Sequence, residues 1–219
     1  MEAEVERLWG QLQPFYEQLH CYVRARLNDR YGDAVVPEDQ AIRADLLGNM
    51  WAQDWSTLMP IARPPGARAT YDTTQLLTRA RYTPVQMTET AERFYTSLGF
   101  PELPDTFWER SLLTRPRDRD VVCHASAWDV DNVDDLRVKQ CIQINAEHFQ
   151  TIHHELGHNF YQRAYNQQPF LYRNGAHDGF HEAIGDTVNL SMTEGYLASV
   201  GLIPPGTKSS REALINRQM

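Results

Sequence analysis

The amino-acid sequence predicts a mainly α fold with one short β-hairpin. Apolar residues recur at helical spacing over most of the 219 residues, and capping signals mark where several helices begin. Patterning typical of strands is confined to two short runs, 121–128 and 138–145, which a polar, Asp-rich segment separates. Because 42% of the residues are hydrophobic, as in ordinary globular proteins, the chain can bury a core.

The first predicted helix covers residues 2–30 and stops near Gly32. Its apolar stripe consists of Val5, Leu8, Leu12, Phe15, Leu19, Tyr22, Val23 and Leu27. The stripe continues past Pro14, which lacks a backbone N–H and is therefore where a kink would occur. We expect one long helix here.

Two further helices are predicted in the middle of the chain. Thr83 and Gln86 have the spacing of a capping box with proline at the first helical position, and this helix should end before Gly99. A short helix is expected over residues 105–112. Both precede the predicted hairpin.

The predicted helices after the hairpin carry the chemically informative residues. Asn145 can cap a helix that runs to about Tyr165. A loop follows at 169–175, and the next helix contains Glu182. We expect these two helices to pack against each other.

Charge and composition exclude several classes of partner. The chain has 29 acidic and 21 basic residues, a formal charge of −8, which argues against a nucleic-acid partner and gives no attraction to an anionic membrane. No apolar run approaches the roughly 20 residues that span a bilayer. The N-terminus lacks the basic start and apolar block of a signal peptide. We therefore expect no export signal and no membrane segment in this chain.

The segment 154–158 reads HELGH, which is typical of zinc peptidases. On an α-helix, residues four apart lie on the same face, so His154 and His158 can bind one metal ion. Glu155 then lies beside the ion, where a carboxylate can act as general base.

A hydrolytic zinc site has three protein ligands and an open position for water, so a third ligand must come from elsewhere in the chain. Glu182 is the predicted ligand, from the next helix. Asp186 follows on the same helical face, where it can accept the spare N–H of a zinc-bound imidazole and fix its tautomer. Three nearby histidines are interpreted as structural or substrate-side residues: His153, His177 and His181.

The three cysteines leave two interpretations open. Cys123 and Cys141 flank the two β-like runs, so a hairpin could join their sulfurs, which would imply an oxidising compartment. Two reduced, buried cysteines fit the spacing equally well. Cys21 is expected to be free in either case.

Four motifs in the same order resemble those of the angiotensin-converting enzyme family of zinc peptidyl-dipeptidases. They are GNMWAQ at 48–53, CHASAWD at 123–129, HELGH at 154–158 and GFHEAIGD at 179–186. The resemblance implies a helical zincin-type peptidase domain in which a deep channel has zinc on its floor. It also implies an extracellular or otherwise extracytoplasmic enzyme that releases dipeptides from the C-terminus of oligopeptides.

The resemblance assigns roles to residues of this chain. Those at the metal are the zinc ligands His154, His158 and Glu182, the general base Glu155 and the supporting carboxylate Asp186. Those toward substrate are Gln53, for the C-terminal carboxylate, and His124 with the backbone of Ala125 and Ala127, for an edge strand on which the peptide is laid. Cys123 and Cys141 match a disulfide of the family.

The chain resembles only the central portion of that family's catalytic domain, so residues 1–219 are expected to form a single partial domain. The Lys, His and Tyr residues that bind the substrate carboxylate and stabilise the oxyanion in the family have no counterpart here, and chloride is possible only in the full domain. Because each oxyanion donor contributes about 10²–10³ in rate, the chain alone should be weakly active or inactive.

Two other functions share the metal motif. One is a non-catalytic zinc-binding protein that retains the ligands without the substrate machinery. The other is a helical zinc carboxypeptidase that removes one residue at a time. The motifs at 48–53 and 123–129 argue against the carboxypeptidase.

Overall fold

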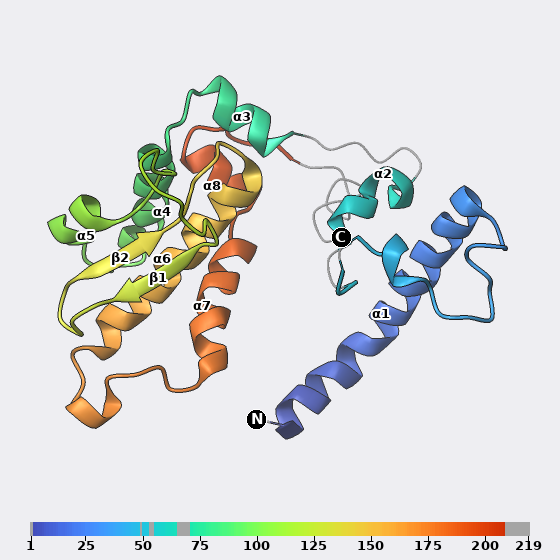
Figure 1. Cartoon of the computed structure of the whole chain (residues 1–219), viewed down its shortest axis with the longest axis horizontal. Coiled ribbons are helices and arrows are strands. Elements are labelled where there is room, and N and C mark those ends of the chain that lie inside the picture. Colours follow the sequence, from blue (N-terminus) through green and yellow to red (C-terminus); the bar gives the residue numbers. More distant parts are fainter. Residues whose placement is uncertain (1, 49, 53–54, 65–70, 209–219) are drawn as a thin grey trace. The chain divides into compact units, whose positions relative to one another are not determined.

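The computed structural model describes residues 2–48, 50–52, 55–64 and 71–208 (Figure 1). It is mainly helical with one hairpin, which confirms the predicted fold class. The described residues divide into two compact units, one before residue 65 and the other formed by residues 71–208. Among the described residues, no helix combines the length and the apolar character needed to cross a membrane.

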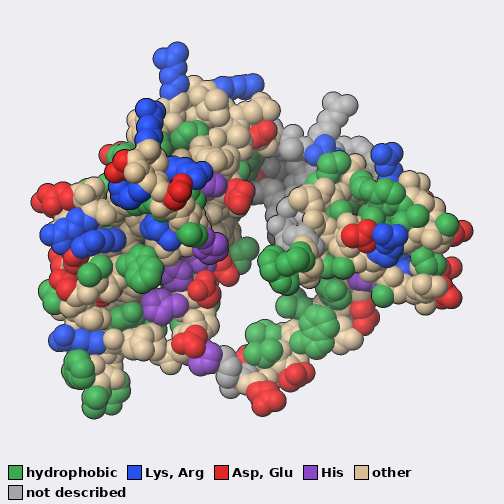
Figure 2. All heavy atoms as spheres, viewed as in Figure 1, with side chains coloured by type: hydrophobic (Ala, Val, Ile, Leu, Met, Phe, Trp, Pro, Cys, Tyr) green, Lys and Arg blue, Asp and Glu red, His purple; other side chains and the backbone are tan. Residues whose placement is uncertain are grey.

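The first unit is built around the long helix α1 (Glu2–Tyr31), which continues through Pro14 as one element. Its other elements are the short helices η1 (Ala44–Leu46), η2 (Ser56–Leu58) and α2 (Met59–Ala62). The C-terminal half of α1 packs into a small core, with Val23 and Leu27 buried. The apolar residues nearer the N-terminus of α1 are exposed, from Val5 to Tyr16 (Figure 2).

The second unit holds all the predicted site residues except Gln53, which lies outside the described residues. Its elements before the hairpin are α3 (Thr73–Arg79), α4 (Pro84–Ser97) and α5 (Asp105–Arg110). The hairpin consists of β1 (Ser126–Asp129) and β2 (Leu136–Lys139). The elements after it are α6 (Ala146–Tyr165), η3 (Phe170–Tyr172), α7 (Asp178–Leu190) and α8 (Glu194–Ser199).

Helix α6 lies at the centre of this unit and packs against α4, α7 and the hairpin (Figure 1). Its buried face contributes Phe149, Ile152, Leu156 and Phe160 to the core. The Asn145 side chain accepts a hydrogen bond from the first turn, so the predicted cap is confirmed. The predicted capping box at the start of α4 is also present.

Helices α6 and α7 approach closely because each has glycine at the contact. A Cβ atom added to Gly157 would lie 3.0 Å from the backbone of Gly185, and one added to Gly185 would lie 2.6 Å from Nδ1 of His154. The missing side chains therefore allow α7 to bring its carboxylates against the imidazoles of α6.

The hairpin is shorter and shifted relative to the two runs expected at 121–128 and 138–145. Ser126 pairs with Lys139 and Asp129 with Leu136 in an antiparallel ladder of four residues per strand, so only residues 126–128 of the first run and 138–139 of the second form strand. The residues before β1 and after β2 are instead joined by a disulfide between Cys123 and Cys141. β-Propensity predicted the strands but not their ends, which depend on the partner strand.

Candidate active site

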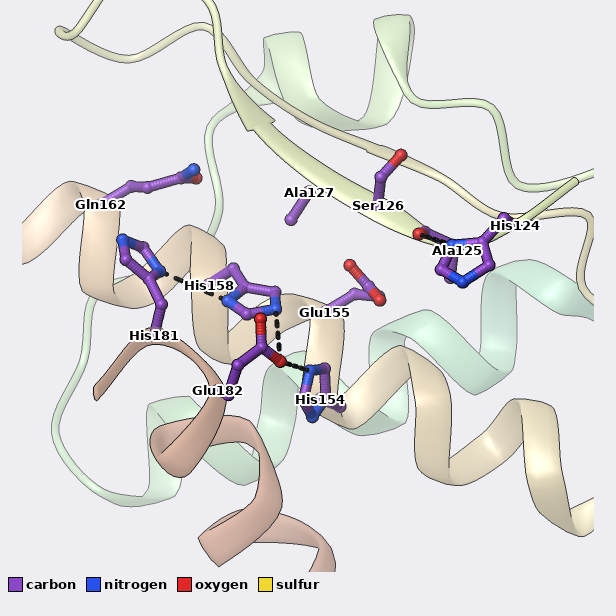
Figure 3. A pocket seen from close by; sticks show the side chains of 10 residues that line it. All are labelled: His124, Ala125, Ser126, Ala127, His154, Glu155, His158, Gln162, His181 and Glu182. Atoms are coloured by element: carbon purple, nitrogen blue, oxygen red, sulfur yellow. Dashed lines mark hydrogen bonds and ion pairs between the residues drawn. The ribbon is translucent and has the colours of Figure 1, made fainter. Parts of the chain in front are cut away.

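The predicted metal ligands, the predicted base and the predicted substrate-side residues of the second unit line one cavity of about 410 Å³ (Figure 3). Helix α6 forms its floor, β1 forms one wall and α7 enters from the opposite side (Figure 3). The lining residues are His124, Ala125, Ser126, Ala127, His154, Glu155, His158, Gln162, His181 and Glu182.

The three predicted metal ligands lie together in this cavity. His154 and His158 are one turn apart on α6, and Glu182 reaches them from α7 (Figure 3). The distance from Oε2 of Glu182 to Nε2 is 3.1 Å for His154 and 3.8 Å for His158. One potential ligand atom from each residue lies within 4.8 Å of the other two.

These distances fit a zinc ion. Ligands at about 2.0–2.2 Å in a tetrahedron are about 3.3 Å from one another, which is close to the separations between Glu182 and the two imidazoles. Two imidazoles and one carboxylate are also a ligand set typical of catalytic zinc. Burial and the neighbouring His154 lower the pKa of His158, which favours the neutral imidazole that binds metal.

Asp186 fixes the orientation of His154. The Nδ1–H of His154 donates to Oδ1 of Asp186 at 3.0 Å, one turn along α7 from Glu182. With that proton on Nδ1, the neutral ring presents a lone pair at Nε2 toward the oxygen of Glu182. A cation between Nε2 and the carboxylate oxygen would offset the repulsion between their lone pairs, so this tautomer fits a metal ion.

Glu155 points into the cavity between the ligands and β1 (Figure 3). Glu155 is only 7% exposed, and its Oε2 is buried with no hydrogen-bond partner among the described residues. Burial raises the pKa of this carboxyl, and the nearby Glu182 adds to the increase. A buried carboxylate oxygen that lacks a protein partner is well suited to accept a proton from water.

The predicted substrate-side residues lie in β1 and in the two positions just before it. The Nδ1–H of His124 donates to the carbonyl of Ala125 at 2.9 Å, while Ala127 lines the cavity opposite α6. Among the described residues, β1 pairs only with β2, so its other edge is open toward the cavity. An open strand edge is what an extended peptide needs for strand addition.

The other three histidines have different places. His153 is fully buried, where its Nδ1–H donates to the carbonyl of Phe149 and Nε2 accepts from Tyr196. His177 caps α7 by accepting from the N–H of Gly179. His181 lines the cavity and lies 3.3 Å from Nδ1 of His158, with its Nδ1 toward that ring.

Sequence reasoning missed two cavity residues, Ser126 and Gln162. Ser126 stands between two residues that were assigned to the substrate strand. Gln162 comes four residues after His158 and therefore lies on the same face of α6, so helical spacing alone could have identified it.

Comparison with known proteins agrees with this arrangement. A sequence model of the angiotensin-converting enzyme family matches residues 1–219. The chain is 45% identical to the angiotensin-converting enzyme of Theromyzon tessulatum over 92% of its length, and 44% identical to that of Haematobia irritans exigua over 99%. It is 44% identical to the angiotensin-converting enzyme of Bos taurus over 94% of its length.

The chain covers only part of each relative. It spans 33% of the Theromyzon protein, 36% of the Haematobia protein and 16% of the Bos protein. The match nevertheless extends over nearly every residue of this chain and includes the whole candidate site. The chain belongs to the angiotensin-converting enzyme family of peptidases.

Proposed function

We propose that this chain carries the zinc centre of a metallopeptidase that releases dipeptides from the C-terminus of oligopeptides. The observation that carries the proposal is the convergence of His154, His158 and Glu182, with Glu155 directly beside them. Family membership supports the same reaction, and the two compact units would then be parts of one catalytic domain.

The proposed ligands and their support have distinct tasks. His154, His158 and Glu182 would hold zinc, and Asp186 would keep His154 in the ligating tautomer. When bound, zinc supplies a Lewis acid that activates water and polarises the scissile carbonyl. The close contact at Gly185 keeps the two helices near enough for this set to form.

The chain's own general base would move the proton. Glu155 accepts a proton from water and delivers it to the leaving amine. Its raised pKa brings the carboxyl closer to neutral pH, so the group can both accept and return the proton. Because it lies between the proposed ligands and β1, it would face a peptide laid on that strand (Figure 3).

The open edge of β1 would hold the peptide substrate. Backbone groups of Ala125 and Ala127 would bind it as an added strand, with His124 beside them. The disulfide between Cys123 and Cys141 is consistent with an extracytoplasmic location.

The test of the base is Glu155→Gln, which keeps the size of the side chain and removes its basicity. We expect hydrolysis of a short peptide to fall by about 10²–10⁴-fold while one zinc ion per chain is retained. Metal content is measured by atomic absorption, and peptide products by mass spectrometry. Full activity with zinc bound would sink the assignment of Glu155, and release of single residues would exclude dipeptide release.

A further inference from the structure

Gln162 is a polar side chain of the cavity that the proposed reaction does not use. It lies at one end of the row of lining residues and His124 lies at the other, with the candidate ligands between them (Figure 3). Its amide extends toward the side of Ala127. In a peptide laid along β1, one residue would therefore lie near the amide of Gln162 and a different residue would lie near His124.

The orientation of this amide follows from its neighbour Asn159, which is fully buried one residue after His158. Nδ2 of Asn159 is 3.3 Å from the carbonyl oxygen of Trp128 in β1 and 3.0 Å from Oε1 of Gln162. A carbonyl oxygen only accepts, so the nitrogen of Asn159 must face Trp128. The second N–H of the same nitrogen then donates to Gln162.

The consequence is that Gln162 has one end engaged and one end free. Its oxygen accepts from Asn159, so the Nε2 group, with two N–H donors, is directed away from that contact. No described residue accepts a hydrogen bond from Nε2 of Gln162, and its side chain is half-buried. At this end of the cavity, Gln162 therefore offers N–H donors, because its acceptor oxygen is already bonded to Asn159.

We propose that Gln162 is a specificity-determining residue that selects a substrate side chain with a carbonyl-type oxygen, a carboxamide or a carboxylate. Asn159 is its positioning residue, because it fixes which end of the amide faces the substrate. The inference rests on the proposed function in that it needs a peptide on β1. Beyond that function, the inference specifies which kind of side chain the enzyme prefers at one position of the peptide.

The test uses peptides that differ at one position at a time, among the two residues on each side of the cut. Each position carries Gln, Glu, Met or Lys, so that carboxamide, carboxylate, apolar and cationic side chains are compared. Dissociation constants are measured on the zinc-loaded 219-residue chain carrying Glu155→Gln, which prevents turnover. The relative kcat/KM is measured on the chain with Glu155 intact.

At one position, peptides with Gln or Glu should bind about 3- to 10-fold tighter than the Met peptide, as expected for one or two hydrogen bonds in a partly exposed site. Gln162→Met should abolish this ratio. Gln162→Glu replaces the donors with acceptors and should shift the preference to Lys, which a merely structural role for Gln162 would not produce. Comparing the Gln and Glu peptides identifies the carboxamide or the carboxylate as the preferred group.

Asn159→Leu tests the positioning role, because it frees Gln162 to rotate and should reduce the ratio without removing the donors. The matched control is Gln150→Met, an exposed glutamine of the same helix, which should leave every ratio unchanged. Because Asn159→Leu alters a buried site, its folding is checked by circular dichroism. The Gln162 variants test the proposal even if the Asn159→Leu variant fails to fold.

The outcomes separate this inference from the proposed function. Peptides that bind with the expected ratios but yield no dipeptide, in incubations long enough to detect the weak activity expected of this chain, would overturn the peptidase and leave the selectivity standing. Peptides that are cleaved with the same preferences in the Gln162→Met chain would overturn the selectivity alone. A chain that neither binds nor cleaves any of the peptides would overturn both.

Discussion

His154 engages two carboxylates through its two ring nitrogens, Asp186 at Nδ1 and Glu182 at Nε2. The two contacts differ in kind. The contact with Asp186 is a hydrogen bond that the imidazole would keep in the proposed zinc site, whereas Nε2 and the oxygen of Glu182 face each other where the proposed ion would lie. One residue therefore couples the orientation of the ring to the assembly of the whole ligand set.

Removal of Asp186 should weaken zinc binding without removing a ligand. We expect Asp186→Ala to lower zinc affinity by about 10- to 100-fold, because the ring of His154 loses the partner that fixes its tautomer. Competition with a chromogenic chelator measures the affinity. Thr187→Ala, at the next and exposed position of α7, is the control, and equal affinities for the two variants would contradict the role of Asp186.

Residue positions in the site were predictable to the extent that helix geometry determines them. The spacing of His154 and His158 predicts a shared face, and the structure places both in the cavity. The contact between Asn159 and Trp128 could not be predicted, because it depends on how α6 meets a strand some 30 residues earlier in the chain. Such packing follows tertiary structure rather than local pattern.

At the scale of secondary-structure elements, the short distance between α6 and α7 depends on the glycines Gly157 and Gly185. Glycine inside a helix normally costs stability relative to alanine by about 0.5–1 kcal/mol. At Gly185 the sign should reverse, because a methyl group there would overlap the ring and carbonyl of His154 at 2.6–2.8 Å. The backbone atoms cannot yield as a flexible side chain would.

Gly185→Ala should therefore destabilise the protein and weaken zinc binding together. We expect the free energy of unfolding to fall by about 1–3 kcal/mol, the usual range for overpacking. Urea denaturation measures the first effect and chelator competition the second. Gly10→Ala is the matched control within α1, since nothing lies within 4 Å of a Cβ atom there, and it should stabilise slightly.

A charged contact joins α5 to β2. Asp135, just before β2, accepts from Arg110 of α5 at 2.6 Å and from Arg137 of β2 at 2.7 and 2.8 Å. The bonds from Arg137 and then Arg110 lower the pKa of Asp135 to about 2. The folded-state pKa is thus below the unfolded value of about 3.9.

This pKa shift has a definite consequence for acid stability. The contribution of Asp135 is fully present above about pH 4 and is lost as the pH falls toward about 2. Asp135→Asn should lower stability at neutral pH and flatten the dependence in this window, as measured by urea denaturation at several pH values. Asp118→Asn, at an exposed aspartate, should leave the dependence unchanged, and an equally steep loss in the Asp135 variant would contradict the assignment.

Long helices were predicted from the sequence more closely than strands or short helices. Capping residues at Thr83 and Asn145 define where α4 and α6 begin, because side-chain oxygens there accept from the first turn. The strands at β1 and β2 are four residues long and depend on cross-strand pairing. The short helix expected over residues 105–112 is present as α5. The short helices α2, α3 and α8 were not predicted, because helices of four to seven residues carry little periodicity.

At the scale of the whole molecule, the disulfide between Cys123 and Cys141 is a covalent cross-link between distant positions of the chain. It links residues 18 positions apart and closes the segment that contains the complete hairpin. A closed loop of this length reduces the entropy of the unfolded chain. Because the hairpin forms one wall of the cavity, the same bond supports both stability and the site.

Replacing Cys123 and Cys141 together with serine should lower the free energy of unfolding by about 3 kcal/mol, the value expected for such a loop. Urea denaturation of the oxidised chain and the double variant gives the difference. Cys21→Ser, at an exposed free cysteine, is the control and should have no effect. Equal stability of the oxidised chain and the double variant would contradict the entropic contribution.

The open edge of β1 also bears on self-association. A strand with unpaired backbone groups is a template for another copy of the same strand, and long, flat, apolar edges aggregate for that reason. Here the edge is four residues long and ends at Asp129, and a loop rich in aspartate follows it. Two copies meeting edge to edge would form few hydrogen bonds and would bring like charges together. The protein can therefore leave one edge of β1 unpaired without acquiring a route to fibrils.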